Sequence, residues 1–232
     1  MKLGSFAWFS GLISRFPAQQ DAFKDISTND APKQSRSQAL KIEDAMQKTS
    51  INGKIELAVH EGIVLERYKD SVGVWTIGVG VTAAAGADID PRTYRDSITV
   101  RHAIDMMEKV LPKYEKIVHR LLDGRRVPQH VFDGLVCAAY NIGASFAYGR
   151  LTRKYVRRGE YRKALVLWRN AGGKPSTAIL KRRDKEATLI ETGMYSQDLI
   201  PLYDGRGRAN TPRRIGEIRA VELKRMMKVR SI

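Results

Sequence analysis

The sequence predicts an α+β domain dominated by helix, and three observations support this fold class. A stretch over 67–81 is rich in Val, Ile, Trp, Tyr and Gly, which is typical of strands. Turn residues at 70–73 and glycines at Gly78 and Gly80 divide this stretch into the short strands of a small antiparallel sheet. Nearly everything after residue 90 has the apolar spacing of helices. One helix, one small sheet and then a run of helices is therefore the expected order.

The first helix is expected to begin after Ser50, whose hydroxyl can cap it, and to end at Glu61-Gly62, because glycine commonly stops a helix. The next helix is expected over 99–122, where apolar residues recur at helical spacing, with a break or bend at Pro112. Pro128 can open the helix that follows at its first turn. Shorter helices are expected around 145–157, 160–170 and 176–192.

The chain is expected to consist of one compact domain over 50–195 with an extension at each end. In the first extension, 1–49, an apolar segment over 1–16 precedes a polar linker over 17–40. This segment has the spacing of an amphipathic element that docks on another surface, and a cleaved signal peptide is the alternative. The second extension, 196–232, is basic and is expected to form a helix from Pro212, either solvated or docked on an anionic surface.

Composition limits the function classes that remain. The 41 Lys and Arg residues exceed the 25 Asp and Glu residues, so the net charge is +16, of which +9 belongs to residues 50–195. This charge predicts a polyanionic partner, such as nucleic acid, an anionic membrane or an anionic cell wall. The single cysteine, Cys137, lies in an apolar helical stretch and is expected to be a buried, inert thiol. No apolar run approaches the roughly 20 residues of a membrane span, and no spacing indicates a metal or cofactor site.

Two carboxylates stand in contrasting surroundings near the predicted sheet. Glu61 lies at the end of an apolar helix, where the helix dipole and partial burial disfavour the charged form, as a general acid requires. Asp70 lies in a turn where solvent and backbone N–H groups are expected to keep it charged, and Thr76 offers a hydroxyl on the next strand. Such a pair suits glycosidic bond cleavage. From composition and spacing alone, an ordinary surface glutamate and a turn-forming aspartate remain the favoured alternative.

The same stretch resembles the phage T4-type lysozymes of glycoside hydrolase family 24. Their signature is a Glu-Gly at a helix end, an Asp nine residues later in a Tyr-Lys-Asp turn, and a Thr six residues further in Thr-Ile-Gly-x-Gly. This chain has Glu61-Gly62, then Tyr68-Lys69-Asp70, then Thr76-Ile77-Gly78-Val79-Gly80. Further matches, in the same order, are Phe132-Asp133-Gly134-Leu135, Ala139-Tyr140-Asn141-Ile142-Gly143-Ala144, Gly172-Gly173-Lys174, Leu180-Lys181-Arg182-Arg183 with Glu186, and Thr192-Gly193-Met194-Tyr195.

The resemblance covers about 50–195 and implies a lysozyme-like fold with a sheet lobe and a helical lobe. It also implies an inverting muramidase that hydrolyses the β-1,4 bond between N-acetylmuramic acid and N-acetylglucosamine in peptidoglycan. Glu61 would be the general acid, while Asp70 and Thr76 would bind and activate water. The matching places Arg182 beside the catalytic glutamate. Tyr68 and Asn141 would contact the substrate or support the catalytic residues.

Two residues near the motif need separate comment, Val81, which departs from the family pattern, and His60, to which the pattern assigns no role. Many members have a histidine directly after Gly-x-Gly, where this chain has Val81, so a histidine contact near the cleft is lost. His60, directly before Glu61, could tune the acid or could be a solvent-exposed bystander. Neither feature alters the catalytic set implied by the resemblance.

Function and location leave further alternatives. A catalytically inactive wall-binding or virion assembly module of the same fold is the main rival, although the complete Glu, Asp and Thr set argues against it. A nucleic-acid binder is suggested by charge alone, and no binding motif supports it. As a lysis enzyme, the protein would wait in the host cytoplasm until a holin lets it reach the periplasm and cell wall. As a virion enzyme, it would contact tail or baseplate proteins through 1–49 and 196–232.

Overall fold

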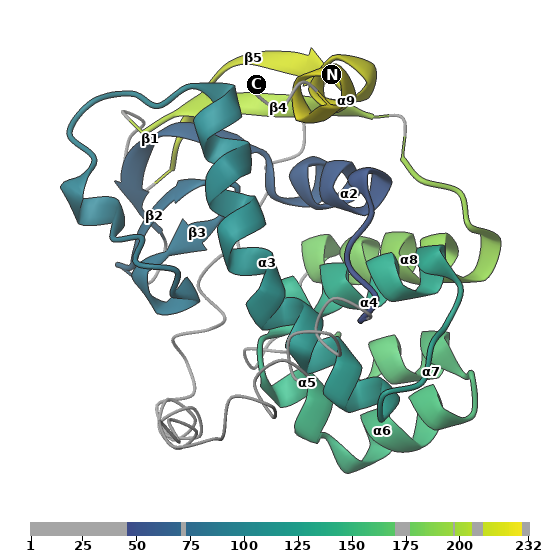
Figure 1. Ribbon diagram of the computed structural model, residues 1–232. Helices are drawn as coiled ribbons and strands as arrows, with labels where there is room; N and C mark the ends of the chain where they lie inside the picture. Colours follow the sequence, from purple (N-terminus) through teal and green to yellow (C-terminus); the bar gives the residue numbers. More distant parts are fainter. Residues whose placement is uncertain (1–45, 71–72, 170–176, 197, 206–210, 229–232) are drawn as a thin grey trace, which may run out of the picture.

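The computed structural model describes residues 46–70, 73–169, 177–196, 198–205 and 211–228. It shows a mostly helical α+β arrangement, as predicted, with a mixed five-stranded sheet at one end and a group of helices at the other (Figure 1). The long helix α3 connects the two ends. The expected apolar segment over 1–16, the linker over 17–40 and Gly172-Gly173-Lys174 lie outside the described residues.

Helix α2 (Ile51–Glu61) begins and ends where the sequence predicts. The Ser50 hydroxyl accepts a hydrogen bond from the Gly53 amide at 3.0 Å and caps the helix. At the other end Gly62 has φ +69°, and its amide donates to the Ala58 carbonyl at 2.8 Å. A glycine fits here because a side chain in this conformation would be strained, and a Cβ would lie 3.0 Å from the Tyr203 ring.

Strands β1 (Ile63–Lys69), β2 (Trp75–Gly78) and β3 (Val81–Thr82) form the predicted antiparallel sheet. Between this sheet and the next long helix lie two short 3-10 turns, η4 (Ala83–Ala85) and η5 (Pro91–Thr93). One face of the sheet contributes Ile63 and Ile77 to the main hydrophobic core, where both side chains are fully buried.

Helix α3 (Val100–Leu122) is one continuous element, so Pro112 does not break it, and the bend that was the predicted alternative stays a prediction. Proline in a helix interior removes one backbone hydrogen bond and usually costs about 3 kcal/mol. The residues on either side of it, Val110, Leu111 and Tyr114, are all buried in the core. Burial of this face along the whole helix outweighs the local penalty.

The helical lobe is built around α4 (Gln129–Ile142), which directly follows Pro128 and whose residues from Val131 onward are all buried. Helices α3, α5 (Ser145–Tyr148) and α8 (Thr177–Thr192) pack directly on it. Helix α6 (Arg150–Arg157) packs on α3 and α5, and α7 (Tyr161–Val166) packs on α6 and α8. Cys137 lies in the buried part of α4, and burial raises the pKa of its thiol, which confirms the prediction of an inert cysteine.

A buried carboxylate, Asp133 of α4, ties three segments together. Its oxygens accept hydrogen bonds from the Ser50 amide at 3.0 Å, the Ser50 hydroxyl at 2.5 Å and the Tyr195 hydroxyl at 2.7 Å. These contacts join the start of α2 to α4 and to the residues after α8. Just before α2, the Thr49 amide and hydroxyl both donate to Glu115 of α3 at 2.7 Å.

Residues after 195 extend the sheet and do not form the expected helix from Pro212. Strand β4 (Leu199–Asp204) pairs in parallel with β1, and β5 (Arg213–Arg219) pairs antiparallel with β4; helix α9 (Ala220–Lys228) then follows. The sheet order is therefore β3-β2-β1-β4-β5, which makes the sheet mixed. Pairing with β4 gives backbone groups over 213–219 hydrogen-bond partners in a strand conformation. The spacing of apolar residues along the sequence does not reveal this pairing.

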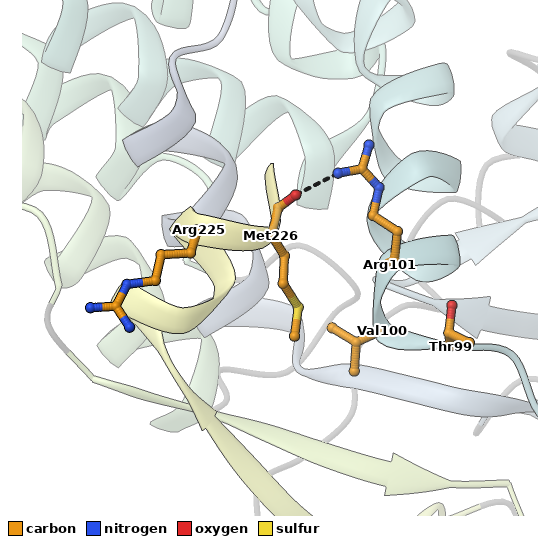
Figure 2. Close-up of a pocket in the computed structure, with 5 residues that line it drawn as sticks. All are labelled: Thr99, Val100, Arg101, Arg225 and Met226. Carbon is orange, nitrogen blue, oxygen red and sulfur yellow. Dashed lines mark hydrogen bonds between the residues drawn. The ribbon is translucent and has the colours of Figure 1, made fainter. Parts of the chain in front are cut away.

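Helix α9 packs on α2 and α3 (Figure 1). Its Leu223 and Met227 side chains are buried in the main core. Figure 2 shows a hollow between α9 and the start of α3, lined by Thr99, Val100, Arg101, Arg225 and Met226, with the Arg101 guanidinium donating to the Met226 carbonyl at 2.6 Å. No helix within the described ranges is long and apolar enough to cross a membrane.

Candidate active site

Glu61 lies at the last position of α2 with its side chain 10% exposed. Its Oε1 forms an ion pair with Nη1 of Arg182, a residue of α8, at 2.6 Å. On the other side, a Cβ placed on Gly80 would lie 3.2 Å from Glu61 Oε2. The backbone between β2 and β3 therefore approaches the carboxylate closely, and the positive φ of +69° at Gly80 gives a second reason for glycine there.

Arg182 belongs to a buried ionic cluster. Its Nε donates to Glu186 at 3.0 Å, and Glu186, which is fully buried, also accepts from Arg183. Arg183 in turn donates to the side-chain oxygen of Asn141 at the end of α4. Two arginines and two carboxylates thus alternate, which compensates charges that burial would otherwise penalise. This cluster links Asn141 to Glu61.

Asp70 and Thr76 are both held by the backbone of Val74. The Val74 amide donates to Asp70 Oδ1 at 2.9 Å, while the Val74 carbonyl accepts from the Thr76 hydroxyl at 3.2 Å. Both side chains are fully buried. The expectation that solvent keeps Asp70 charged is therefore wrong, because the side chain has no exposed surface. The expected backbone N–H contact is present.

Tyr68 lies beside these residues through strand pairing. Its Cα is opposite that of Thr76 in the β1–β2 ladder, so the two side chains project from the same face of the sheet. The Tyr68 ring is 4% exposed and belongs to a small apolar cluster with Val64 and Tyr203. Tyr203 comes from β4, so a residue outside the expected catalytic domain supports this face.

His60 is buried, so the alternative that it is a solvent-exposed bystander is wrong. Its side chain is 5% exposed and its Nε2 lies 3.4 Å from Glu56 Oε1. Burial first, and then the nearby charges of Arg182, Lys185 and Arg183, lower its pKa well below 6.5. The ring is therefore neutral at pH 7, and it lies on the side of α2 that packs inward.

The position after Gly80, where many family members have histidine, is a core position in this chain. Val81 is fully buried in β3 and pairs with Ile77 of β2. A valine side chain at this position therefore packs in the hydrophobic interior.

Two buried tyrosines, Tyr114 and Tyr140, border the site. The Tyr140 hydroxyl donates to the Val79 carbonyl at 2.6 Å, and the Tyr114 and Tyr140 rings lie 4.4 Å apart. Burial, together with the negative charge of Glu61, raises the pKa of both phenols. Both stay neutral, and the Tyr140 hydrogen bond to Val79 fixes the β2–β3 turn near Glu61. A buried tyrosine usually needs a hydrogen-bond partner for its hydroxyl. This rule was the signal in the sequence that could have pointed to a polar contact of Tyr140.

The sequence-predicted residues thus form two groups. Glu61 and Arg182 meet at the end of α2, backed by Glu186, Arg183 and Asn141, while Asp70, Thr76 and Tyr68 lie together on β1, β2 and the turn between them. One carboxylate contacts a cation and the other a backbone amide. Two carboxyl groups in different surroundings can divide acid and base roles in a hydrolytic reaction.

Comparisons with known proteins agree on one family. The family model described as "Phage lysozyme" matches residues 58–186. The endolysin of Salmonella phage P22 is 30% identical over 150 residues, which cover 62% of this chain and 99% of that protein. The endolysin of Bacillus phage B103 is also 30% identical, but the match spans only 50% of its length. An endolysin structure from Escherichia coli O157:H7 phage FAHEc1 superposes with a TM-score of 0.56 at 26% identity, covering 65% of this chain and 97% of that one.

Proposed function

Since the chain belongs to the phage lysozyme family and is a peptidoglycan glycoside hydrolase, we propose that it cleaves the β-1,4 bond between N-acetylmuramic acid and N-acetylglucosamine with Glu61 as general acid. The observation that carries the assignment is the placement of Glu61 at the end of α2, in an ion pair with Arg182 at 2.6 Å and against Gly80. Arg182 fixes the direction of the carboxyl group.

Asp70 and Thr76 bind and position the attacking water in this proposal. Their shared anchor is the backbone of Val74, whose amide binds the carboxylate and whose carbonyl accepts from the hydroxyl, so the two side chains are held at fixed places relative to each other. Glu61 gives its proton to the glycosidic oxygen as the bond to the sugar breaks. The water on the opposite face loses a proton to Asp70 as it forms the new bond, so atoms and protons balance. Attack from that face inverts the anomeric centre.

The test of the acid is Glu61→Gln, which keeps the shape of the side chain and removes its proton. Loss of general acid catalysis is worth about 10²–10⁴-fold, so lysis of purified peptidoglycan should slow at least 100-fold with unchanged folding. Glu108→Gln is the matched control, since Glu108 pairs with Lys54 away from the site. Near-normal turnover by Glu61→Gln would remove this residue from the mechanism, and an inactive wild type would favour the binding-module alternative.

The products test the role of Asp70. Hydrolysis should give reducing-end sugars, and the anomer formed first, followed by NMR, should be the inverted one. If the mass spectra are dominated by 1,6-anhydro sugars, which are lighter by one water, water is not the acceptor and Asp70 is structural.

We further propose that the enzyme acts on the host cell wall during lysis, which rests on relatives named as endolysins. The virion-tail alternative has no observation in its favour. Quantifying the chain in purified virions and in infected-cell lysate distinguishes the two, because a lysis enzyme should be abundant in the lysate and absent from virions.

A further inference from the structure

The helical end of the molecule carries a dense group of unbalanced cations. Residues 150–169 contain eight Lys and Arg residues and one acidic residue, Glu160. Glu160 is already paired with Lys163 at 2.6 Å. Arg150, Arg153, Lys154 and Arg158 are exposed, and none forms an ion pair with a carboxylate in the part of the chain that the structure describes. Charge alone therefore predicts attraction to an anionic surface.

Apolar side chains are exposed among these cations. Leu151 and Leu167 are each 43% exposed. The Trp168 indole N–H donates to the Thr152 hydroxyl at 3.0 Å, which brings the start of α6 next to the residues that follow α7. The two leucines therefore lie on neighbouring stretches at the open end of the α6–α7 hairpin. We call the four cations named above, with these two leucines, the α6–α7 face.

We propose that the α6–α7 face binds an anionic lipid surface. A soluble polyanion would satisfy the cations and leave both leucines in water, whereas a lipid interface takes charge at its headgroups and apolar side chains just below them. The face belongs to the end of the molecule opposite the five-stranded sheet, which carries Asp70 and Thr76 (Figure 1). Docking through it leaves the sheet lobe directed away from the lipid.

The test measures binding of the full chain to vesicles of phosphatidylcholine, with and without 30% phosphatidylglycerol, by co-sedimentation. Arg153→Ser with Lys154→Ser should lower partitioning onto anionic vesicles about 25-fold, since each cation near such a surface contributes about fivefold. Arg95→Ser with Lys109→Ser removes the same charge from exposed positions elsewhere and should change partitioning by less than about twofold, because screening limits distant charges. Thermal melts confirm that each variant is folded.

The leucines decide between lipid and a soluble polyanion. Leu151→Ser with Leu167→Ser should lower vesicle binding about tenfold while leaving binding to soluble polyglutamate unchanged. If this variant binds vesicles like the wild type, or if the cation variant matches its control, the proposal is overturned. All measurements can be repeated in the Glu61→Gln background, where equal binding separates this surface from the proposed catalytic function.

Discussion

Removal of the Glu186 charge should strongly destabilise the protein, because this carboxylate is the fully buried partner of two arginines. In Glu186→Gln the shape is kept, but Arg182 and Arg183, with side chains 12% and 2% exposed, lose that charge. Breaking a buried pair by removing one partner costs about 3–5 kcal/mol. That is a large part of the roughly 5–15 kcal/mol that stabilises a typical domain. The midpoint of thermal unfolding should fall by roughly 6–20 °C.

A matched control lies five residues further along α8. Glu191 also forms an ion pair with an arginine, Arg162, whose Nη2 lies 2.7 Å from Glu191 Oε2, but the two side chains are 44% and 45% exposed. An exposed pair of this kind contributes about 0–1 kcal/mol, so Glu191→Gln should shift the midpoint only slightly. Circular dichroism melts and urea titrations of both variants give the comparison. Equal losses in the two variants would refute the reasoning that burial sets the strength of the cluster.

Three further outcomes are expected. Gly53→Ala should destabilise the protein although alanine favours helices, because its Cβ would lie 2.5 Å from Asp133 Cγ. Urea titration compares this variant with Gly216→Ala, where an added Cβ meets nothing within 4 Å. Stability should fall as pH drops below 6.5, because the lowered pKa of His60 means that the unfolded chain binds its proton first. His60→Asn should flatten the stability profile between pH 7.5 and 5 if this linkage holds. Deleting 196–232 should leave a folded, active but less stable enzyme, as melts and peptidoglycan cleavage would show; complete unfolding would make these residues part of the catalytic domain.

Local physics let the sequence determine much of this protein. The cap at Ser50, the stop at Gly62 and the strand-forming composition with turn residues over 67–81 are short-range features. The structure contains the cap, the stop and the antiparallel strands. The spacing of Glu61, Asp70 and Thr76 could likewise be taken directly from the sequence. Their relation to a known family, and not their spacing alone, turned an ordinary glutamate and turn aspartate into a candidate site.

Other features depended on segments far apart in the chain, and only the tertiary structure decided them. Arg182 reaches Glu61 from a helix 121 positions later, a contact that only the family resemblance suggested. Strand β4 pairs with β1 although all the helices from α3 to α8 lie between them in the sequence. No periodicity of the residues after 195 predicts this pairing. His60 and Asp70 look solvent-exposed in sequence and are buried in the structure. Burial depends on which distant surfaces cover a side chain, so a local pattern cannot specify it.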